Sequence, residues 1–198
     1  PSYAVKAGDR INQMRIWKDK YLVFMTQWGN AMMDLDTEQI SPIFSSGKSY
    51  GNHCFLIDSQ DYIWITTGYT LYRIKMDNEQ DQRVFRCGQD GLGKQSISAI
   101  YEDKEGRIFF GTQGSGLYKF DEKNNTFKGY TTDNSLILSD YCYDIKESTQ
   151  GYLILSGDKG ISFFDPGQEQ FKVVELGTAL PVSGINKGCG LLVCKNGE

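Results

Sequence analysis

Few residues of this chain are of the types that carry out catalysis. The 198 residues include a single histidine, His53, so a Ser-His-Asp or Cys-His nucleophile would have to use it. In the internal repeat described below, His53 falls on an innermost strand at the position of Ser98, which favours a structural role over that of a general base. We therefore predict no catalytic residue in this segment.

Metal and cofactor chemistry is also poorly represented. The five cysteines are Cys54, Cys87, Cys142, Cys189 and Cys194. Their spacing contains no CxxC pair of the kind that a zinc site uses, and their odd number leaves at least one thiol free or paired between chains. The glycine-rich stretches 88–94 and 114–116 lack the strand-to-helix context and the GK[ST] ending of a phosphate-binding loop. We predict no metal and no cofactor.

The amino-acid composition indicates the kind of secondary structure that must position any functional site. Aromatic residues make up 13% of the chain, and 22 glycines accompany only 4 prolines, which favours many short strands joined by tight turns. The net charge of −4, without a run of five like charges, argues against nucleic acid, which needs a concentrated basic face. No apolar stretch reaches the roughly 18 residues of a membrane span. We therefore expect any membrane anchor to lie outside this segment.

Internal repetition is the strongest signal in the sequence. Residues 97–130 read as four short strands, and a similar pattern recurs with Gly151 placed 45 residues after Gly106 and Asp61 placed 45 residues before it. A period of 40 to 45 residues with four strands in each unit is typical of β-propeller blades. The predicted blade-like repeats are 11–45, 52–86, 97–130, 142–174 and a shortened copy at 182–198. We therefore expect an all-β chain of four-stranded antiparallel blades, about four to five in number.

Two sets of equivalent positions are expected to support the blades. Gly106, Gly151 and Asp61 share a turn at which a positive φ angle is expected, because Gly adopts it freely and Asp tolerates it. A second set shares one position on a central blade strand, where apolar neighbours predict burial on both faces. This set, expected to fill the core between blades, comprises Val23, Trp64, Phe109 and Ile154.

The best conserved unit within the chain resembles the two-component regulator propeller repeat. The pattern is an apolar strand, Glu-Asp, two loop residues, Gly, an apolar strand with an aromatic residue, Gly-Thr, Gly-Leu and aromatic-Asp. It is carried by Ile100, Glu102, Asp103, Gly106, Ile108, Phe109, Gly111, Thr112, Gly116, Leu117, Phe120 and Asp121. The copy at 142–174 departs from it, with Ser148 in place of Asp103 and Ser156-Gly157 in place of Gly111-Thr112.

This resemblance implies a fold, a location and a role. In that family the repeats build seven-bladed propellers in the periplasmic sensor region of hybrid two-component histidine kinases anchored in the inner membrane. A seven-bladed ring needs about 315 residues at this period, so we expect the chain to form an incomplete propeller. Its open blade faces would then be covered by a homodimer partner or by the rest of the propeller.

Ligand-binding residues are expected in the loops that join the second and third strands of each blade, because such loops gather at one mouth of the propeller. The candidate residues are Trp28, Tyr69, Gln113, Asp158 and Lys159. The two aromatic rings can stack on sugar rings, and the polar groups can bind hydroxyls or a uronic acid carboxylate. Loops 88–96 and 131–140, which lead into innermost strands, are expected to contribute to the same surface.

Three functions remain open from the sequence. The first is a non-catalytic sensor that recognises an oligosaccharide and signals across the membrane. The second is a propeller-fold glycosidase or lyase, which requires two carboxylates about 5 to 10 Å apart; its candidates are Asp140, Asp144 and Asp158. The third is a scaffold that docks another protein chain.

Overall fold

We describe a computed structural model of the chain over residues 10–26, 29–44 and 54–172. Within these ranges the chain forms 16 strands and no helix, so none of the described residues belongs to a helix able to cross a membrane. The predicted residues Trp28 and His53, the cysteines Cys189 and Cys194, and the shortened repeat at 182–198 lie outside the described residues. The chain divides into two compact units, Pro1–Phe85 and Arg86–Glu198, and each is described by itself.

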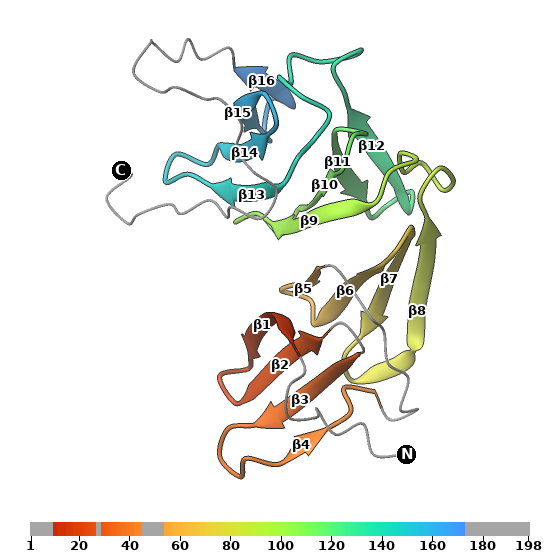
Figure 1. Cartoon of the computed structure of the whole chain (residues 1–198), viewed down its shortest axis with the longest axis vertical. Coiled ribbons are helices and arrows are strands. Elements are labelled where there is room, and N and C mark those ends of the chain that lie inside the picture. Colours follow the sequence, from red (N-terminus) through yellow and green to blue (C-terminus); the bar gives the residue numbers. More distant parts are fainter. Residues whose placement is uncertain (1–9, 27–28, 45–53, 173–198) are drawn as a thin grey trace. The chain divides into compact units, whose positions relative to one another are not determined.

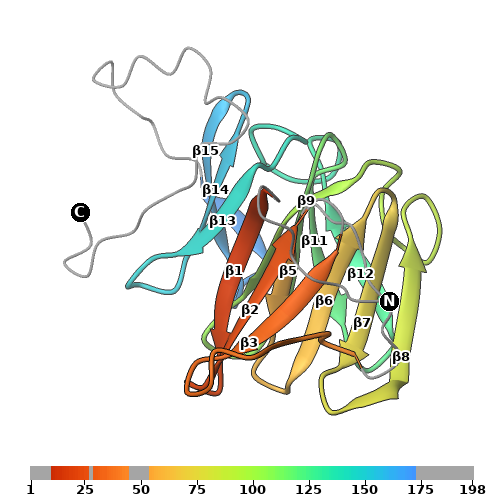
Figure 2. The ribbon, with the colours of Figure 1, turned by 60° about the horizontal axis from the view of Figure 1, so that its bottom comes forward.

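The first unit contains two antiparallel sheets of four strands, each formed by strands in chain order (Figure 1). One sheet consists of β1 (Ile11–Trp17), β2 (Tyr21–Thr26), β3 (Asn30–Asp34) and β4 (Ile40–Ser41). The other consists of β5 (Phe55–Ile57), β6 (Tyr62–Thr67), β7 (Thr70–Lys75) and β8 (Asn78–Arg86). Buried apolar side chains from both sheets pack into one core: Val23, Met25, Ile43, Phe44, Phe55, Ile63, Ile65 and Ile74. Figure 2 shows how the successive strands of this unit lie side by side.

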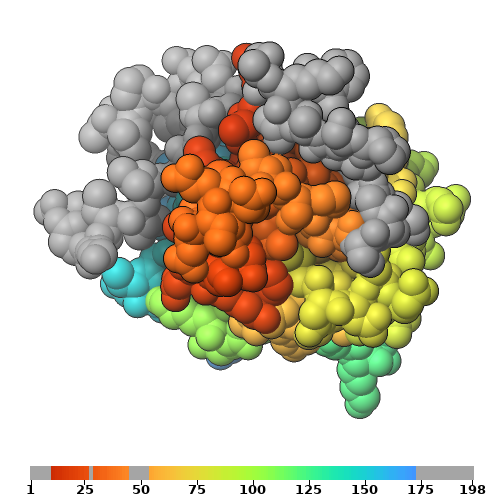
Figure 3. All heavy atoms as spheres, turned by 90° about the horizontal axis from the view of Figure 1, so that it is seen from below, coloured from red at the N-terminus to blue at the C-terminus, as the bar shows by residue number. Residues whose placement is uncertain are grey.

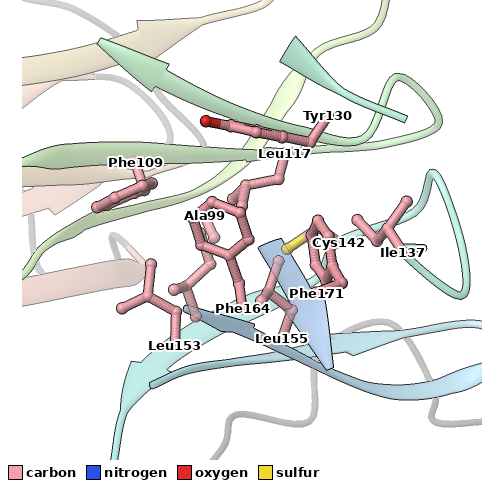
Figure 4. Close-up of a cluster of buried hydrophobic side chains, with 11 residues drawn as sticks. Ala99, Phe109, Leu117, Tyr130, Ile137, Cys142, Leu153, Leu155, Phe164 and Phe171 are labelled. Carbon is pink, nitrogen blue, oxygen red and sulfur yellow. The ribbon is translucent and has the colours of Figure 1, made fainter. Parts of the chain in front are cut away.

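The second unit repeats the arrangement. Its first sheet has β9 (Ile97–Glu102), β10 (Ile108–Thr112), β11 (Leu117–Asp121) and β12 (Thr126–Tyr130). Its second sheet has β13 (Asp144–Glu147), β14 (Leu153–Gly157), β15 (Gly160–Asp165) and β16 (Gln170–Lys172). The core between these sheets contains Phe109, Tyr130, Leu153, Phe164 and seven further buried residues (Figure 4). The four described sheets confirm an all-β fold of propeller blades, fewer than the seven of a full ring.

The turn between the first two strands of a blade is built in the same way in three blades. Asp58, Asp103 and Ser148 each accept a hydrogen bond from the backbone N–H four residues later, at 2.9, 2.9 and 3.0 Å. The residue three places after each of them has a positive φ: 61° at Asp61, 76° at Gly106 and 84° at Gly151. The predicted turn conformation is thus confirmed. An L-residue with a large side chain would be strained there.

The central strand position is buried as predicted in three blades. Val23, Trp64 and Phe109 have no exposed surface. Ile154 differs, because it is only half-buried, on the face of β14 opposite to that of Leu153 and Leu155. The expectation that all four residues fill a core between blades is therefore correct for Phe109 and Val23, which belong to the cores described above.

One apolar face of the first sheet is exposed in part, although Phe24 and Ala31 on that face are buried. Met14 and Ile16 on β1 are 55% and 63% exposed, and Ile40 on β4 is 50% exposed. The strand register places Ile16, Leu22, Met33 and Ile40 in one row across the four strands. Figure 3 shows the surface of the first unit, with β1 to β4 in red and orange. In the three other described sheets, apolar rows of this kind are buried or half-buried.

An ion-pair network joins the two sheets of the second unit. The Glu169 carboxylate, in the turn before β16, accepts hydrogen bonds from Lys119 Nζ on β11 at 2.6 Å and from Lys128 Nζ on β12. These two ammonium groups lower the pKa of Glu169 to about 2. Burial, together with the neighbouring Glu169 carboxylate, raises the pKa of Tyr130. The negative charge on Glu169 therefore holds the outer strands of the two blades together.

We expect the Glu169→Gln variant to lose less stability than the wild type as the pH is lowered. The pKa of Glu169 in the folded protein is about 2, below its ordinary value of 4.5, so the charged carboxylate stabilises the fold above pH 4.5. That stabilisation is lost as the pH falls from 4.5 towards 2. The melting temperature of the wild type should therefore fall more steeply across this interval than that of the variant. Glu38→Gln, in an exposed turn, is the control, and parallel curves for wild type and Glu169→Gln would refute the assignment.

Candidate ligand-binding loop cluster

Four loops gather at one end of the two sheets of the second unit. They are residues 87–96 before β9, 113–116 between β10 and β11, 131–143 between β12 and β13, and 158–159 between β14 and β15. Antiparallel pairing places them together, because β9 and β10 pair at Ile97 and Thr112, and β11 and β12 pair at Leu117 and Tyr130. We refer to these four loops as the rim loops.

The segment 139–143 connects the two sheets and is bonded to both. The Asp140 carbonyl accepts hydrogen bonds from the N–H groups of Gly114 and Gly116, at 3.1 and 2.8 Å. The Cys142 N–H donates to the Thr112 carbonyl at 2.8 Å, and the Tyr143 N–H donates to the Ser156 carbonyl at 2.8 Å. This backbone is consequently fixed on the β10 side and on the β14 side.

Side-chain hydrogen bonds hold the same segment in place. The Ser139 hydroxyl donates to the Asp158 carboxylate and accepts a hydrogen bond from the Tyr141 N–H at 3.0 Å. The Asp140 carboxylate accepts hydrogen bonds from the N–H and the hydroxyl of Thr132, at 2.8 and 2.9 Å. The rim loops therefore form a preorganised surface instead of independent turns.

Tyr141 is the exposed aromatic residue of this surface. Its side chain is 44% exposed, whereas Tyr118 and Tyr130 in the same unit are 8% and 5% exposed. A Cβ atom added at Gly114 would lie 3.4 Å from Cζ of Tyr141, so the ring rests close to the glycine backbone. The ring centroid of Tyr143 lies 6.2 Å away, with the two planes at 49°. Tyr141 is thus supported by neighbours and remains partly open to solvent.

The structure brings three of the predicted binding residues into the rim loops. Gln113 is half-buried and pairs with Tyr141 in an isolated antiparallel bridge, while Asp158 and Lys159 are exposed in the turn between β14 and β15. Tyr69 is 61% exposed in the turn between β6 and β7 of the first unit, so it does not join them within one unit. Trp28 lies outside the described residues. Sequence reasoning missed Tyr141, although it directly follows the predicted loop 131–140.

Acidic groups dominate the charge near Tyr141. Asp140, Asp144 and Asp158 lie on or next to the rim loops, and Asp144 is paired with Lys146 at 3.1 Å. Burial and the Asp158 carboxylate raise the pKa of Tyr143. Burial and the Asp140 carboxylate likewise raise the pKa of Tyr118. A ligand at this surface therefore meets a negative local field.

The geometry gives little support to catalysis at the rim loops. The three carboxylates proposed for an enzyme all have hydrogen-bond or ion-pair partners: Thr132 for Asp140, Lys146 for Asp144 and Ser139 for Asp158. Burial raises the pKa of the Cys142 thiol, which keeps the sulfur protonated and weakly nucleophilic. Over the described ranges, no cluster of three His, Cys, Asp or Glu residues is placed to hold a metal ion.

Sheets of four antiparallel strands, each formed by strands in chain order, define a segment of a β-propeller. Residues 91–114 match the family model described as two component regulator propeller, which confirms over this range the resemblance inferred from the sequence. No curated protein matches the chain.

Solved structures share this fold at low sequence identity. The extracellular domain of a protein described as a one-component system from B. thetaiotaomicron superposes with a TM-score of 0.71 and 19% identity, over 86% of this chain and 23% of that one. The extracellular domain of a protein described as a hybrid two-component system from the same organism gives 0.66 and 20%, over 89% and 23%. A catalytically inactive virginiamycin B lyase from Staphylococcus aureus gives 0.67 and 14%, over 89% and 58%. The chain thus spans about a quarter of the length of the two extracellular domains.

Proposed function

We propose that this chain is a non-catalytic, ligand-sensing part of a propeller sensor domain of a two-component system, and that its rim loops bind an oligosaccharide. The observation that carries the proposal is the preorganised surface around Tyr141, an exposed aromatic ring with polar side chains on loops fixed by hydrogen bonds. Sugar rings are recognised by this combination, since aromatic faces contact their C–H groups and fixed polar atoms bind their hydroxyls. The family match at residues 91–114 supports the sensor role.

The location that we propose is periplasmic, in a protein anchored in the inner membrane by a segment outside this chain. Support comes from the structural similarity to extracellular domains of B. thetaiotaomicron signalling systems. Signalling across the membrane would follow if the ligand binds two arrangements of the sensor with different affinity.

An enzyme is the second candidate, favoured by the similarity in fold to virginiamycin B lyase. A propeller glycosidase or lyase would need carboxylates free to act on the substrate. The pairing of Asp140, Asp144 and Asp158 with neighbouring side chains weighs against it.

For partners, we propose that a further propeller blade covers the apolar face of β1 to β4. Met14, Ile16 and Leu22 occupy the positions that Phe55, Ile57 and Ile63 occupy in the next blade, 41 residues later. In that blade these positions contribute to the core against β1 to β4, with Phe55 and Ile63 buried. Exposed apolar area of this kind marks an interaction surface. A homodimer that uses this face is the alternative occupant.

Calorimetric titration of the purified chain with a panel of neutral and uronic acid oligosaccharides tests the proposed function. Saturable binding without bond cleavage is the expected result. No detectable binding to any oligosaccharide of the panel would contradict oligosaccharide sensing. Release of reducing ends or unsaturated products would favour the enzyme. Light scattering on the same samples tests the apolar face: discrete dimers would support the homodimer over a further blade.

A further inference from the structure

We propose that Tyr141 is the stacking platform of the rim loops and that it selects a neutral pyranose ring over an acidic one. This inference rests on the proposed oligosaccharide function and goes further by naming the residue and the ligand charge. Its basis is the geometry around the Tyr141 side chain.

The backbone that carries the Tyr141 ring is held in place by hydrogen bonds. The Tyr141 N–H is bonded to Ser139, the adjacent Asp140 carbonyl accepts two hydrogen bonds, and the following Cys142 N–H donates to Thr112. The backbone of Tyr141 is therefore held on both sides. An aromatic residue held in this way loses little conformational entropy when a ligand binds, which is the advantage of a preorganised site.

Gly114 leaves space beside the Tyr141 ring. Gly114 has a φ of 113°, a conformation that L side chains rarely adopt, and the place of its missing side chain lies 3.4 Å from the Tyr141 ring and 3.6 Å from Cγ of Gln95. The glycine therefore supports one side of the ring without a side chain of its own. Gln113 and Gln95 flank this point, and both carry amides suited to sugar hydroxyls.

The charged groups around Tyr141 are mostly acidic. Asp158 accepts a hydrogen bond from Ser139, the residue bonded to the Tyr141 N–H, and Asp140 is the adjacent residue in the chain. The rim loops carry four carboxylates, Asp90, Asp133, Asp140 and Asp158, against two ammonium groups, Lys94 and Lys159, and Asp144 beside them is paired with Lys146. A uronic acid carboxylate brought to Tyr141 would meet net like charge. A neutral sugar pays no such repulsion and can donate its hydroxyls to the acidic groups.

Titration of the neutral oligosaccharide that binds the wild type best, into Tyr141→Ala and Tyr141→Phe, tests the platform. We expect about a tenfold or larger loss of affinity for Tyr141→Ala, because the stacking face is removed, and a change of no more than about threefold for Tyr141→Phe, because that face is kept. Val84→Ala, on exposed β8 in the first unit, is the control and should bind like the wild type. Thermal melts establish that each variant is folded.

Each outcome separates the inference from the proposed function. Absence of binding by the wild type would contradict the function itself. Binding by Tyr141→Ala equal to that of the wild type would overturn the platform while leaving the function standing. An equal loss of affinity in both Tyr141 variants would overturn stacking and show that the Tyr141 hydroxyl makes the contact. A uronic acid oligosaccharide that binds more tightly than its neutral counterpart would overturn the charge selection.

Discussion

Gly116→Ala should lower the free energy of unfolding by roughly 3 kcal/mol, one of the largest effects of any single methyl group in this chain. Gly116 has a φ of 84°, and a Cβ atom at this position would lie 2.1 Å from the carbonyl oxygen of Tyr130. That oxygen belongs to the backbone where β12 pairs with β11, at the Leu117–Tyr130 register. The clash therefore cannot be relieved by a side-chain rotation, and the two strands must separate.

Gly68→Ala is the matched control for this substitution. Gly68 has a φ of 57° in the equivalent turn of the second blade, between β6 and β7, and no atom lies within 4 Å of an added Cβ. It should lose only about 1 kcal/mol, the cost of the left-handed conformation alone. Urea denaturation followed by circular dichroism, which reports on the strands of both units, measures both variants. Equal losses would show that the contact with Tyr130 is not responsible.

Phe164→Ala should destabilise the second unit by about 3 to 5 kcal/mol. The ring is fully buried between the two sheets and lies 4.8 Å from Tyr130, 4.9 Å from Phe171 and 6.0 Å from Phe109, measured between ring centroids (Figure 4). Its removal leaves a cavity bordered by three aromatic rings, which can only partly close because both sheets hold them.

Phe163→Ala is the matched control, because the neighbouring ring lies on the opposite face of β15 and is only half-buried. We expect its loss of stability to be less than half of that of Phe164→Ala. Chemical denaturation of the two variants side by side measures the difference. Similar losses would mean that the core between β9 to β12 and β13 to β16 is not the main source of stability in this unit.

The repeat made much of the fold predictable. The period predicts the four-stranded unit, and the shared turn position predicts the positive φ angles of Asp61, Gly106 and Gly151. Local chemistry determines these features, since a tight turn selects the same residue types wherever it recurs. The burial of Phe109 followed in the same way from its central strand position.

The remaining features depend on contacts between segments that the repeat does not specify. Glu169 looks like an ordinary turn residue, and only the placement of β16 beside β11 and β12 brings it to Lys119 and Lys128. Tyr141 is exposed because residues 139–143 cross from one sheet to the next, whereas Tyr118 and Tyr130, on strands, are buried. The position in the loops is enough to predict Gln113, Asp158 and Lys159. It is not enough to predict Tyr141, which lies in the same rim loops.

The crossing at residues 139–143 also affects how a bound molecule would act on the protein. Its hydrogen bonds reach Thr112 on one sheet and Ser156 on the other. The position of this short connection therefore depends on both blades. A ligand bound to residues 139–143 would favour the spacing between the two blades at which it binds best. By thermodynamic reciprocity, a change in that spacing would change the affinity for the ligand. The same five residues, 139–143, would then both contact the ligand and transmit its binding to the two blades.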